Sequence, residues 1–281
     1  PGFAAPDVTV ECSGVTCLEH SVVPASADAF HIWNVSVDVE GTLGTVSAKI
    51  NLMDLFQSNT AVATIFSGAP DSVALKPTGV DSIACTWEDR CAFEDGFHVY
   101  FAEGDVPSSE PTAKLPPDTT AHTFDGLLAN TLYSCSVSAH SGALESARSA
   151  PVPVWAWARV PAPPVLSDPS MDSIKVSVGT GDLNPPSTEY ALRLRTEGKE
   201  VQWIQAGGIA GDAPEWKTAD AWATVIVSGL APATGYHVSC VARNGAGEMT
   251  EAGPEEVIHT QCDLKYTAGE NGTVTEALRL A

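Results

Sequence analysis

Seven cysteines and seven histidines are the side chains of this sequence best suited to bind a metal ion or to act as nucleophiles. No two cysteines form a Cys-x-x-Cys pair, and the sequence has no His-x-His or His-Glu-x-x-His motif. It also lacks a Gly-x-Ser-x-Gly elbow and a phosphate-binding glycine loop. Adjacent acidic pairs such as Glu94-Asp95 should point to opposite sides of an extended chain. We therefore expect no enzyme, no metal site and no cofactor.

The cysteines favour an oxidising, secretory environment, because they are scattered through strand-like segments. The sequence also carries two Asn-x-Ser/Thr sequons, at Asn34 and Asn271, where we expect glycosylation. Cys12 and Cys17 bracket a Ser-Gly-Val-Thr turn that could bring them together in a disulfide. The odd number of cysteines leaves at least one without a partner inside the chain. Those left unassigned are Cys91, Cys240 and Cys262.

The net charge is −21, from 14 basic and 35 acidic residues spread along the chain. This charge excludes nucleic-acid partners, because phosphate binding needs clusters of lysine and arginine. An anionic membrane surface is disfavoured for the same reason. We interpret the acidity as a source of solubility rather than of calcium binding, since no Asp-x-Asp-x-Asn-Gly loop is present. No apolar run reaches the roughly 18 residues of a membrane helix, so no membrane span is predicted.

A repeat emerges when the sequence is aligned with itself. Residues 126–143 (GLLANTLYSCSVSAHSGA) match residues 229–246 (GLAPATGYHVSCVARNGA) at eight of eighteen positions, an offset of 103. Upstream, residues 80–87 (VDSIACTW) match residues 171–178 (MDSIKVSV) at an offset of 91. The second copy therefore holds twelve extra residues, which we assign to 205–216. A repeat of about one hundred residues made of short strands indicates domain duplication.

The second copy contains a corner followed by a run of period two that ends at an Asn-Gly turn. The pattern is Leu230-x-Pro232-x-Thr234-x-Tyr236-x-Val238-x-Cys240-x-Ala242-x-Asn244-x-x-Gly247. It resembles the E–F corner and the F strand of a fibronectin type III domain. Residues 161–166 (PAPPVL) and 173–178 (SIKVSV) resemble the first two strands of that family.

The first copy shares this resemblance in part. Trp87 matches the core tryptophan of strand B in the family, whereas Ala129 and Ser141 stand where the family has proline and asparagine. The likeness covers about residues 70–260. It implies seven-stranded sandwiches with a binding or spacer role, and it implies that Tyr133 and Tyr236 are buried corner residues.

The resemblance also bears on two of the cysteines. Cys85 is in phase with Trp87 on presumed strand B, and Cys135 is in phase with Tyr133 on presumed strand F. Both should face the core from opposite sheets, as in immunoglobulin domains, and we predict a disulfide between them. The alternative is two buried thiols that pack as small apolar groups.

The two ends of the chain lie outside the repeat. Residues 1–69 contain four strand-like runs, at 8–12, 30–40, 45–52 and 61–66. Because a complete sandwich has seven strands, we expect an immunoglobulin-like unit there and leave open whether it is complete. The tail 263–281 contains one more alternating run, 273–281, with Val274, Leu278 and Leu280 on one face. This run, or residues 1–12, could add a strand to another chain, or the tail could fold back on its own chain.

Trp155 and Trp157 alternate with small residues at the junction between the two copies. One interpretation places them in a core between the domains. The other is an exposed aromatic stripe on an edge strand, which would mark a surface for a partner.

We therefore expect an all-β chain of tandem immunoglobulin-like and fibronectin type III-like β-sandwiches, divided at 1–69, 70–160 and 161–262. The predicted function is that of an extracellular or cell-surface structural or adhesive glycoprotein, a subunit of a surface fibre or other assembly joined by β-strand addition. Its partners would be copies of itself, other extracellular proteins or glycans. The alternatives are a receptor ectodomain with an exposed loop at 205–222, and an accessory module of a carbohydrate-active enzyme with aromatic residues on one face.

Overall fold

The computed structural model describes residues 69–91 and 94–262 in full and the backbone of six strands between residues 7 and 66. The chain divides into two compact units. One consists of Pro1–Leu127 with Leu132–Val154, and the other of Leu128–Thr131 with Trp155–Ala281. In the described part of the chain, no helix has the length and apolarity needed to cross a bilayer.

The N-terminal part of the first unit contains two antiparallel sheets. One has the order β1-β4-β5 with β6 also paired to β4, and the other is the two-stranded sheet β2-β3. The strands are β1 (Asp7–Ser13), β2 (Thr16–Pro24), β3 (Trp33–Glu40), β4 (Leu43–Leu52), β5 (Phe56–Gln57) and β6 (Ala61–Phe66).

The prediction of four strands in this region is wrong, because β2 and β5 are additional. Strand β2 escapes a search for alternation because its ladder with β3 shifts register between Cys17 and Glu19. A bulge of this kind places an extra residue in one strand and breaks the period of two. Strand β5 has two residues and is too short to show any period.

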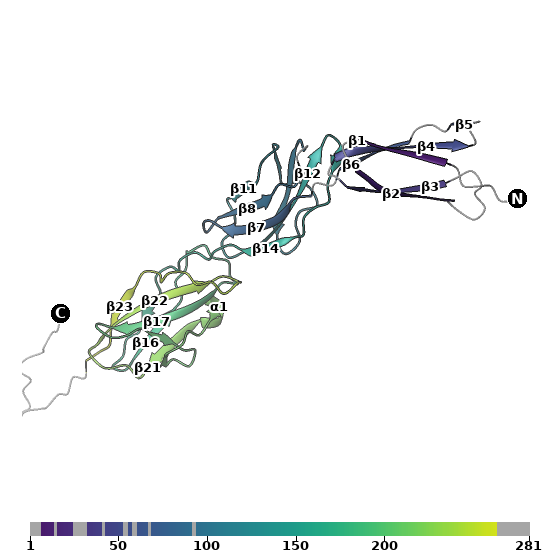
Figure 1. Ribbon diagram of the computed structural model, residues 1–281. Coiled ribbons are helices and arrows are strands. Elements are labelled where there is room, and N and C mark those ends of the chain that lie inside the picture. Colours follow the sequence, from purple (N-terminus) through teal and green to yellow (C-terminus); the bar gives the residue numbers. More distant parts are fainter. Residues whose placement is uncertain are drawn as a thin grey trace, which may run out of the picture. The chain divides into compact units, whose positions relative to one another are not determined.

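The first complete sandwich lies between residues 71 and 155. One sheet has the order β11-β8-β7, and the other has the order β10-β9-β12-β13 with β14 also paired to β12. Figure 1 shows β7, β8 and β11 side by side. The bounds are β7 (Asp71–Pro77), β8 (Ser82–Glu88), β9 (Gly96–Glu103), β10 (Ala113–Leu115), β11 (Ala121–Asp125), β12 (Leu132–Ser141), β13 (Leu144–Glu145) and β14 (Val152–Trp155).

The core of this sandwich follows the predicted phase on β8, whereas the middle of β12 is buried on both faces. Ile83, Cys85 and Trp87 on β8 are all buried, while the residues between them are partly or fully exposed. The ring of Phe101 on β9 stacks on Phe124 of the opposite sheet, with centroids 3.9 Å apart, and on Tyr133, at 5.1 Å. Stacked rings in a core add to the free energy gained by burying their apolar surface.

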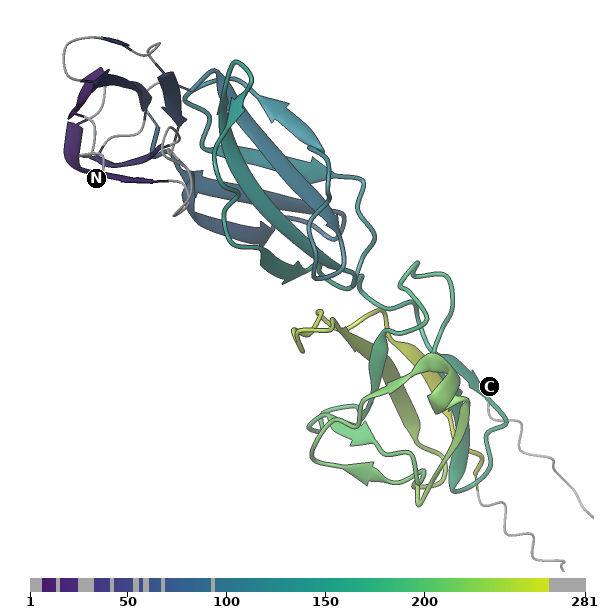
Figure 2. The same cartoon turned by 90° about the vertical axis from the view of Figure 1, so that its right-hand side faces the viewer.

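The second sandwich belongs to the second unit. Its sheets have the orders β15-β16-β21 and β19-β18-β17-β22-β23, with β20 paired to β17. Figure 2 shows its one short helix, α1 (Ala219–Trp222), as a single coil. The strands are β15 (Val165–Ser167), β16 (Ser173–Ser177), β17 (Glu189–Thr196), β18 (Gln202–Ile204), β19 (Ala210–Gly211), β20 (Lys217–Thr218), β21 (Thr224–Ser228), β22 (Gly235–Arg243) and β23 (Glu256–His259).

The two sandwiches distribute their main strands in the same way. In each sandwich, main strands one, two and five along the chain form the three-stranded sheet. Main strands three, four, six and seven belong to the larger sheet. The extra strands are β13 in the first sandwich and β19 and β20 in the second. This shared order is the structural counterpart of the repeat in the sequence.

The twelve extra residues of the second copy are part of the sheet rather than a simple loop. The turn after β18 leads into β19, which pairs back onto β18. Gly208 in this turn has φ +77°, and its carbonyl oxygen accepts a hydrogen bond from the Ser228 N–H at 2.8 Å. A Cβ atom at Gly208 would lie 1.9 Å from the carbonyl oxygen of Ile226, so only glycine fits.

We predict that Gly208→Ala lowers the free energy of unfolding of the second unit by about 1–3 kcal/mol, through backbone strain and this overlap. Gly207→Ala is the matched control, because a Cβ atom there meets no atom within 4 Å. Urea unfolding followed by tryptophan fluorescence measures both variants. Equal stability of the two variants would contradict the position of this turn.

Candidate functional site

Three carboxylates meet where the loops of the first sandwich join its two sheets. Asp89 directly follows β8, Glu94 lies two residues before β9, and Asp118 lies between β10 and β11. The sheet registers explain this meeting. Thr86 near the end of β8 pairs with Ala121 at the start of β11, and Leu115 at the end of β10 pairs with Phe97 on β9. The residues just beyond these pairs are therefore brought to one end of the sandwich.

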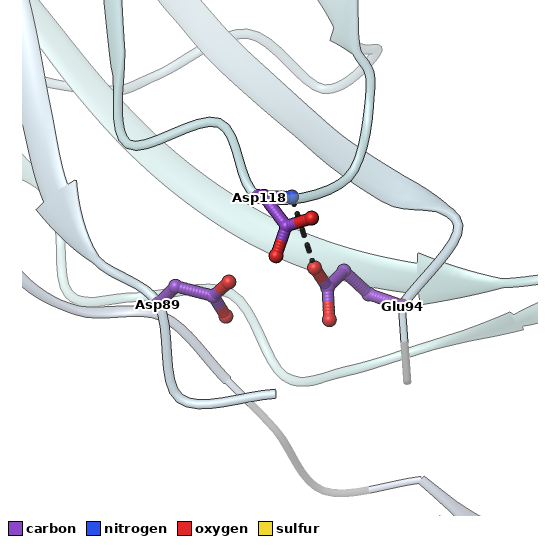
Figure 3. A group of neighbouring side chains, drawn as sticks. All are labelled: Asp89, Glu94 and Asp118. Carbon is purple, nitrogen blue, oxygen red and sulfur yellow. Dashed lines mark hydrogen bonds between the residues drawn. The ribbon is translucent and has the colours of Figure 1, made fainter. Parts of the chain in front are cut away.

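The geometry of this acidic cluster is compact. One oxygen of each carboxylate lies within 4.8 Å of the others, and Figure 3 shows the three groups pointing toward one another. The Cys91 N–H donates to Asp89 Oδ1 at 2.9 Å, and the Asp118 N–H donates to Glu94 Oε1 at 3.1 Å. Asp118 holds a left-handed backbone, with φ +58°, a conformation that aspartate and asparagine tolerate.

The three members differ in burial. Glu94 is 8% exposed, Asp89 is half-buried and Asp118 is exposed. The second carboxylate oxygen of Glu94, Oε2, is buried and has no hydrogen-bond partner among the described residues. A buried polar atom without a partner costs free energy, so this oxygen is the unusual feature of the cluster.

The surroundings of Asp89 disfavour its ionised form. The pKa of Asp89 is raised, mainly by burial and also by the negative charges of Glu94 and Asp118. The hydrogen bond from the Cys91 N–H lowers this pKa but does not cancel the rise. The arginine next to Asp89 in the sequence, Arg90, pairs with Asp71 at 2.8 Å and with Glu88 at 2.6 Å. Its charge is thus engaged outside the cluster.

A second polar cluster surrounds Glu145 on the sheet that contains β9, β12 and β13 of the same sandwich. The carboxylate of Glu145 accepts hydrogen bonds from Tyr100 and from Ser138, the latter at 2.5 Å. Burial would raise the pKa of Glu145, but these hydrogen bonds outweigh it and hold the pKa below its usual value. Arg148 lies over the ring of Tyr100, 3.4 Å from its centroid. The hydrogen bonds of Glu145 thus have a structural explanation within this sheet.

The predicted pair of cysteines meets between the sheets. Cys85 on β8 and Cys135 on β12 are both fully buried, with their Sγ atoms 3.4 Å apart. The structure records both as thiols, and the neighbouring Cys85 and burial both raise the pKa of Cys135. A disulfide needs the two sulfurs about 2.05 Å apart, closer than these thiols lie. The disulfide stays a prediction.

We predict that peptide mapping without reductant finds Cys85 joined to Cys135. The bond should stabilise the first sandwich by about 2–4 kcal/mol, so reduction lowers its melting temperature. A peptide joining Cys85 to Cys91 would contradict this assignment.

The control for this prediction comes from the second sandwich. The repeat aligns Cys85 with Val176 and Cys135 with Val238, and both valines are fully buried in the second core. The double variant Cys85→Val, Cys135→Val should therefore fold, and its melting temperature should no longer respond to reductant.

The other cysteines have different surroundings. Cys240 is buried in the second core, and burial raises the pKa of its thiol to about 12. Cys91 is buried in the first unit, and Cys262 is partly exposed. Cys12 lies on β1 opposite Val46, and Cys17 lies on β2 in the other sheet. The side chains of the last two lie outside the described residues, so their disulfide stays a prediction.

Both corner tyrosines are buried. Tyr236 is 7% exposed, and its hydroxyl oxygen accepts a hydrogen bond from the Ala231 N–H at 2.8 Å, as a tyrosine corner requires. Tyr133, at the matching place on β12, is 4% exposed and stacks on Phe101.

We predict that Tyr236→Phe lowers the free energy of unfolding of the second unit by about 1 kcal/mol, because the corner loses its hydroxyl hydrogen bond. Thermal and urea unfolding of the variant measure this change. Unchanged stability would show that the Ala231 N–H finds an equally good partner.

The two tryptophans do not form a stripe on one strand. Strand β14 ends at Trp155, which is half-buried and packs against Gly245, where a Cβ atom would lie 2.4 Å from the indole ring. Trp157 lies beyond the strand and is 40% exposed. Of the two rings, only that of Trp157 is exposed, and the alternative of an aromatic surface for a partner stays a prediction. Their place in a core between domains stays a prediction.

Some predicted sites fall outside the described residues. Asn34 lies on β3 opposite Val23, but its side chain is not described. The others outside the described part are Asn271, Val274, Leu278 and Leu280. Glycosylation and strand donation by these residues stay predictions.

The acidic cluster was missed by sequence reasoning. In the sequence Glu94 forms an adjacent pair with Asp95, and Asp118 lies 29 residues after Asp89. The available signal was the placement of acidic residues at the ends of strands that share an end of the sandwich. That signal becomes visible only when the pairing of β8 with β11 is known.

Comparison with known proteins places one part of the chain in a family. Residues 68–155 match the family described as "Fibronectin type III domain". No curated protein matches the sequence of this chain. Residues 68–155 therefore form a fibronectin type III domain.

Solved structures show weaker likenesses. The chain is similar to a two fibronectin type III domain segment from chicken tenascin, with 17% identity over 68% of this chain and 99% of that chain and a TM-score of 0.46. It is similar to the FN1–FN3 domains of chicken CNTN1, with 14% identity over 92% and 100% of the two chains and a TM-score of 0.32. A computationally redesigned β-sandwich protein shares 22% identity over 32% and 95%, with a TM-score of 0.29. The fold assignment rests on the family match and on the strand order.

Proposed function

We propose that this chain is a non-enzymatic structural or adhesive protein of the cell exterior, and that its copies associate by β-strand addition. The observation that carries the proposal is the fibronectin type III domain at residues 68–155, followed by a sandwich with the same strand order. Domains of this family occur in extracellular adhesion proteins, where repeated sandwiches serve as binding modules and spacers.

The N-terminal sheets supply an acceptor for an added strand. Strands β2 and β3 form a sheet of two, and each is paired on one side only among the described strands. With nine and eight residues, they are long enough to offer a row of free backbone groups. A sheet of two strands is marginally stable alone, and a third strand would pair these groups and cover apolar side chains.

One of the two candidate donor segments has a partner strand in its own chain. Residues Asp7–Ser13 form β1 and pair with Thr45–Asn51 of β4 in the same chain. This pairing within the chain favours the other terminus as the donor. The remaining candidate is the alternating run 273–281, which lies outside the described residues.

The two alternatives have less support. Residues 205–222, suggested as a ligand loop, include β19, β20 and α1, and are held by hydrogen bonds such as that from Ala206 N–H to Glu215 at 2.7 Å. An accessory carbohydrate-binding module would need an exposed aromatic platform. Among the described side chains, Trp157 is the one exposed large aromatic group.

We predict that Leu278→Asn with Leu280→Asn weakens self-association about tenfold or more, because these residues form the apolar face of the proposed donor. The matched control is Thr275→Asn with Arg279→Asn, on the opposite face of the same run. Sedimentation velocity and electron microscopy of the full chain measure association. A wild-type protein that stays monomeric, or equal association of both variants, would refute the donor role.

A further inference from the structure

We propose that Asp89, Glu94 and Asp118 form a binding site for a divalent cation, and that Ca²⁺ is the ion it takes. The site lies in the fibronectin type III domain, at the loops that join its two sheets (Figure 3). It is independent of strand addition, since it uses none of the strands or segments involved there.

The spacing of the carboxylates suits Ca²⁺. Each ligand oxygen of Ca²⁺ lies about 2.3–2.6 Å from the ion, so two ligands on opposite sides are about 5 Å apart. The oxygens of the cluster lie within 4.8 Å of one another. One ion can therefore contact all three carboxylates without a rearrangement of the strands that flank them.

The orphan oxygen of Glu94 is the second and independent observation. Glu94 is 8% exposed, and its Oε2 atom is buried without a hydrogen-bond donor among the described residues. Its side chain points toward Asp89 and Asp118 (Figure 3). A buried carboxylate oxygen is stabilised by a donor, a proton or a metal ion. A cation between the three groups supplies the missing partner.

The charge balance favours a divalent ion over a basic side chain. Three carboxylates converge, while the guanidinium of Arg90 binds Asp71 and Glu88 instead. Ca²⁺ accepts six to eight oxygen ligands in an adaptable geometry, so carboxylates together with backbone carbonyls and water can complete its shell. Mg²⁺ requires a tighter octahedron and retains its water, which suits three protein carboxylates on loops less well.

Binding would link parts of the domain that are distant in sequence. Asp89 and Glu94 belong to the β8–β9 connection, and Asp118 belongs to the β10–β11 connection. An ion held by both connections ties the two sheets together at this end. We therefore expect Ca²⁺ to raise the melting temperature of the first sandwich and to leave that of the second unchanged.

The test is calorimetric titration of the full chain with CaCl₂ after removal of metal ions with a chelator, together with thermal unfolding with and without Ca²⁺. We expect one site with a Kd of about 10⁻⁴–10⁻³ M or tighter, the range of extracellular modules. Glu94→Gln and Asp118→Asn should each weaken it about tenfold or more, because each removes one ligand charge. Asparagine tolerates the left-handed backbone at position 118, so this variant keeps the loop.

Asp105→Asn is the matched control, because it removes an exposed acidic charge from the same sandwich outside the cluster. The Asp105→Asn variant should bind Ca²⁺ with the affinity of the wild type. This result would distinguish binding at the cluster from a general attraction of cations to a chain of charge −21. No saturable binding by the wild-type chain up to roughly 10 mM CaCl₂ would overturn the proposal, since even weak extracellular sites are filled there. Equal weakening by all three substitutions would overturn it as well.

Discussion

The apolar contact between two facing sheets is the constraint on which each sandwich depends. In the first, Ile83 and Cys85 of one sheet and Cys135 of the other are completely buried; in the second, Ile174, Val176 and Val238 occupy the corresponding positions and are equally buried. Each such side chain gains about 1.5–3 kcal/mol when it leaves water. The pair Cys85 and Cys135 has valines in its place in the second copy, so the fold needs two small apolar groups there and not sulfur chemistry. A disulfide would add stability to a core that is already closed.

The same constraint leaves the loops at the ends of the strands free to differ. In the first sandwich, the connection between β8 and β9 brings Asp89 and Glu94 toward Asp118. In the second, the matching connection at 178–188 is longer, and its Asp182 accepts a hydrogen bond from the Tyr190 hydroxyl at 2.9 Å. Burial and this aspartate raise the pKa of Tyr190. The matching loops of the two sandwiches thus use their acidic residues differently. In the second sandwich Asp182 binds the Tyr190 hydroxyl, whereas in the first Asp89 and Glu94 face Asp118.

The sequence was sufficient for those features that depend on local pattern. Alternation predicted the inward face of β8, and the Leu-x-Pro-x-Thr-x-Tyr motif predicted the corner at Tyr236. The prediction of a single buried face for β22 is wrong, because Ser239 and Val241 on its other face are buried too. The sequence failed where the pattern is interrupted or too short, as at the bulge in β2 and at the two residues of β5. It failed also for the acidic cluster, because the meeting of Asp89 with Asp118 depends on which strands pair and in which register.

Alternation shows that a segment forms a strand, but not with which strand it pairs. The segment at Asp7–Ser13 was equally suited to join another chain, and it pairs with β4 of its own. The proposed association between copies would have to overcome the repulsion between chains that each carry a charge of −21. At physiological ionic strength, salt screens the repulsion between exposed charges that lie more than about 8 Å apart. Paired strands lie about 4.8 Å apart and are held by uncharged backbone hydrogen bonds. Strand addition is therefore a mode of contact that remains open to an acidic chain, because its attraction does not depend on side-chain charge.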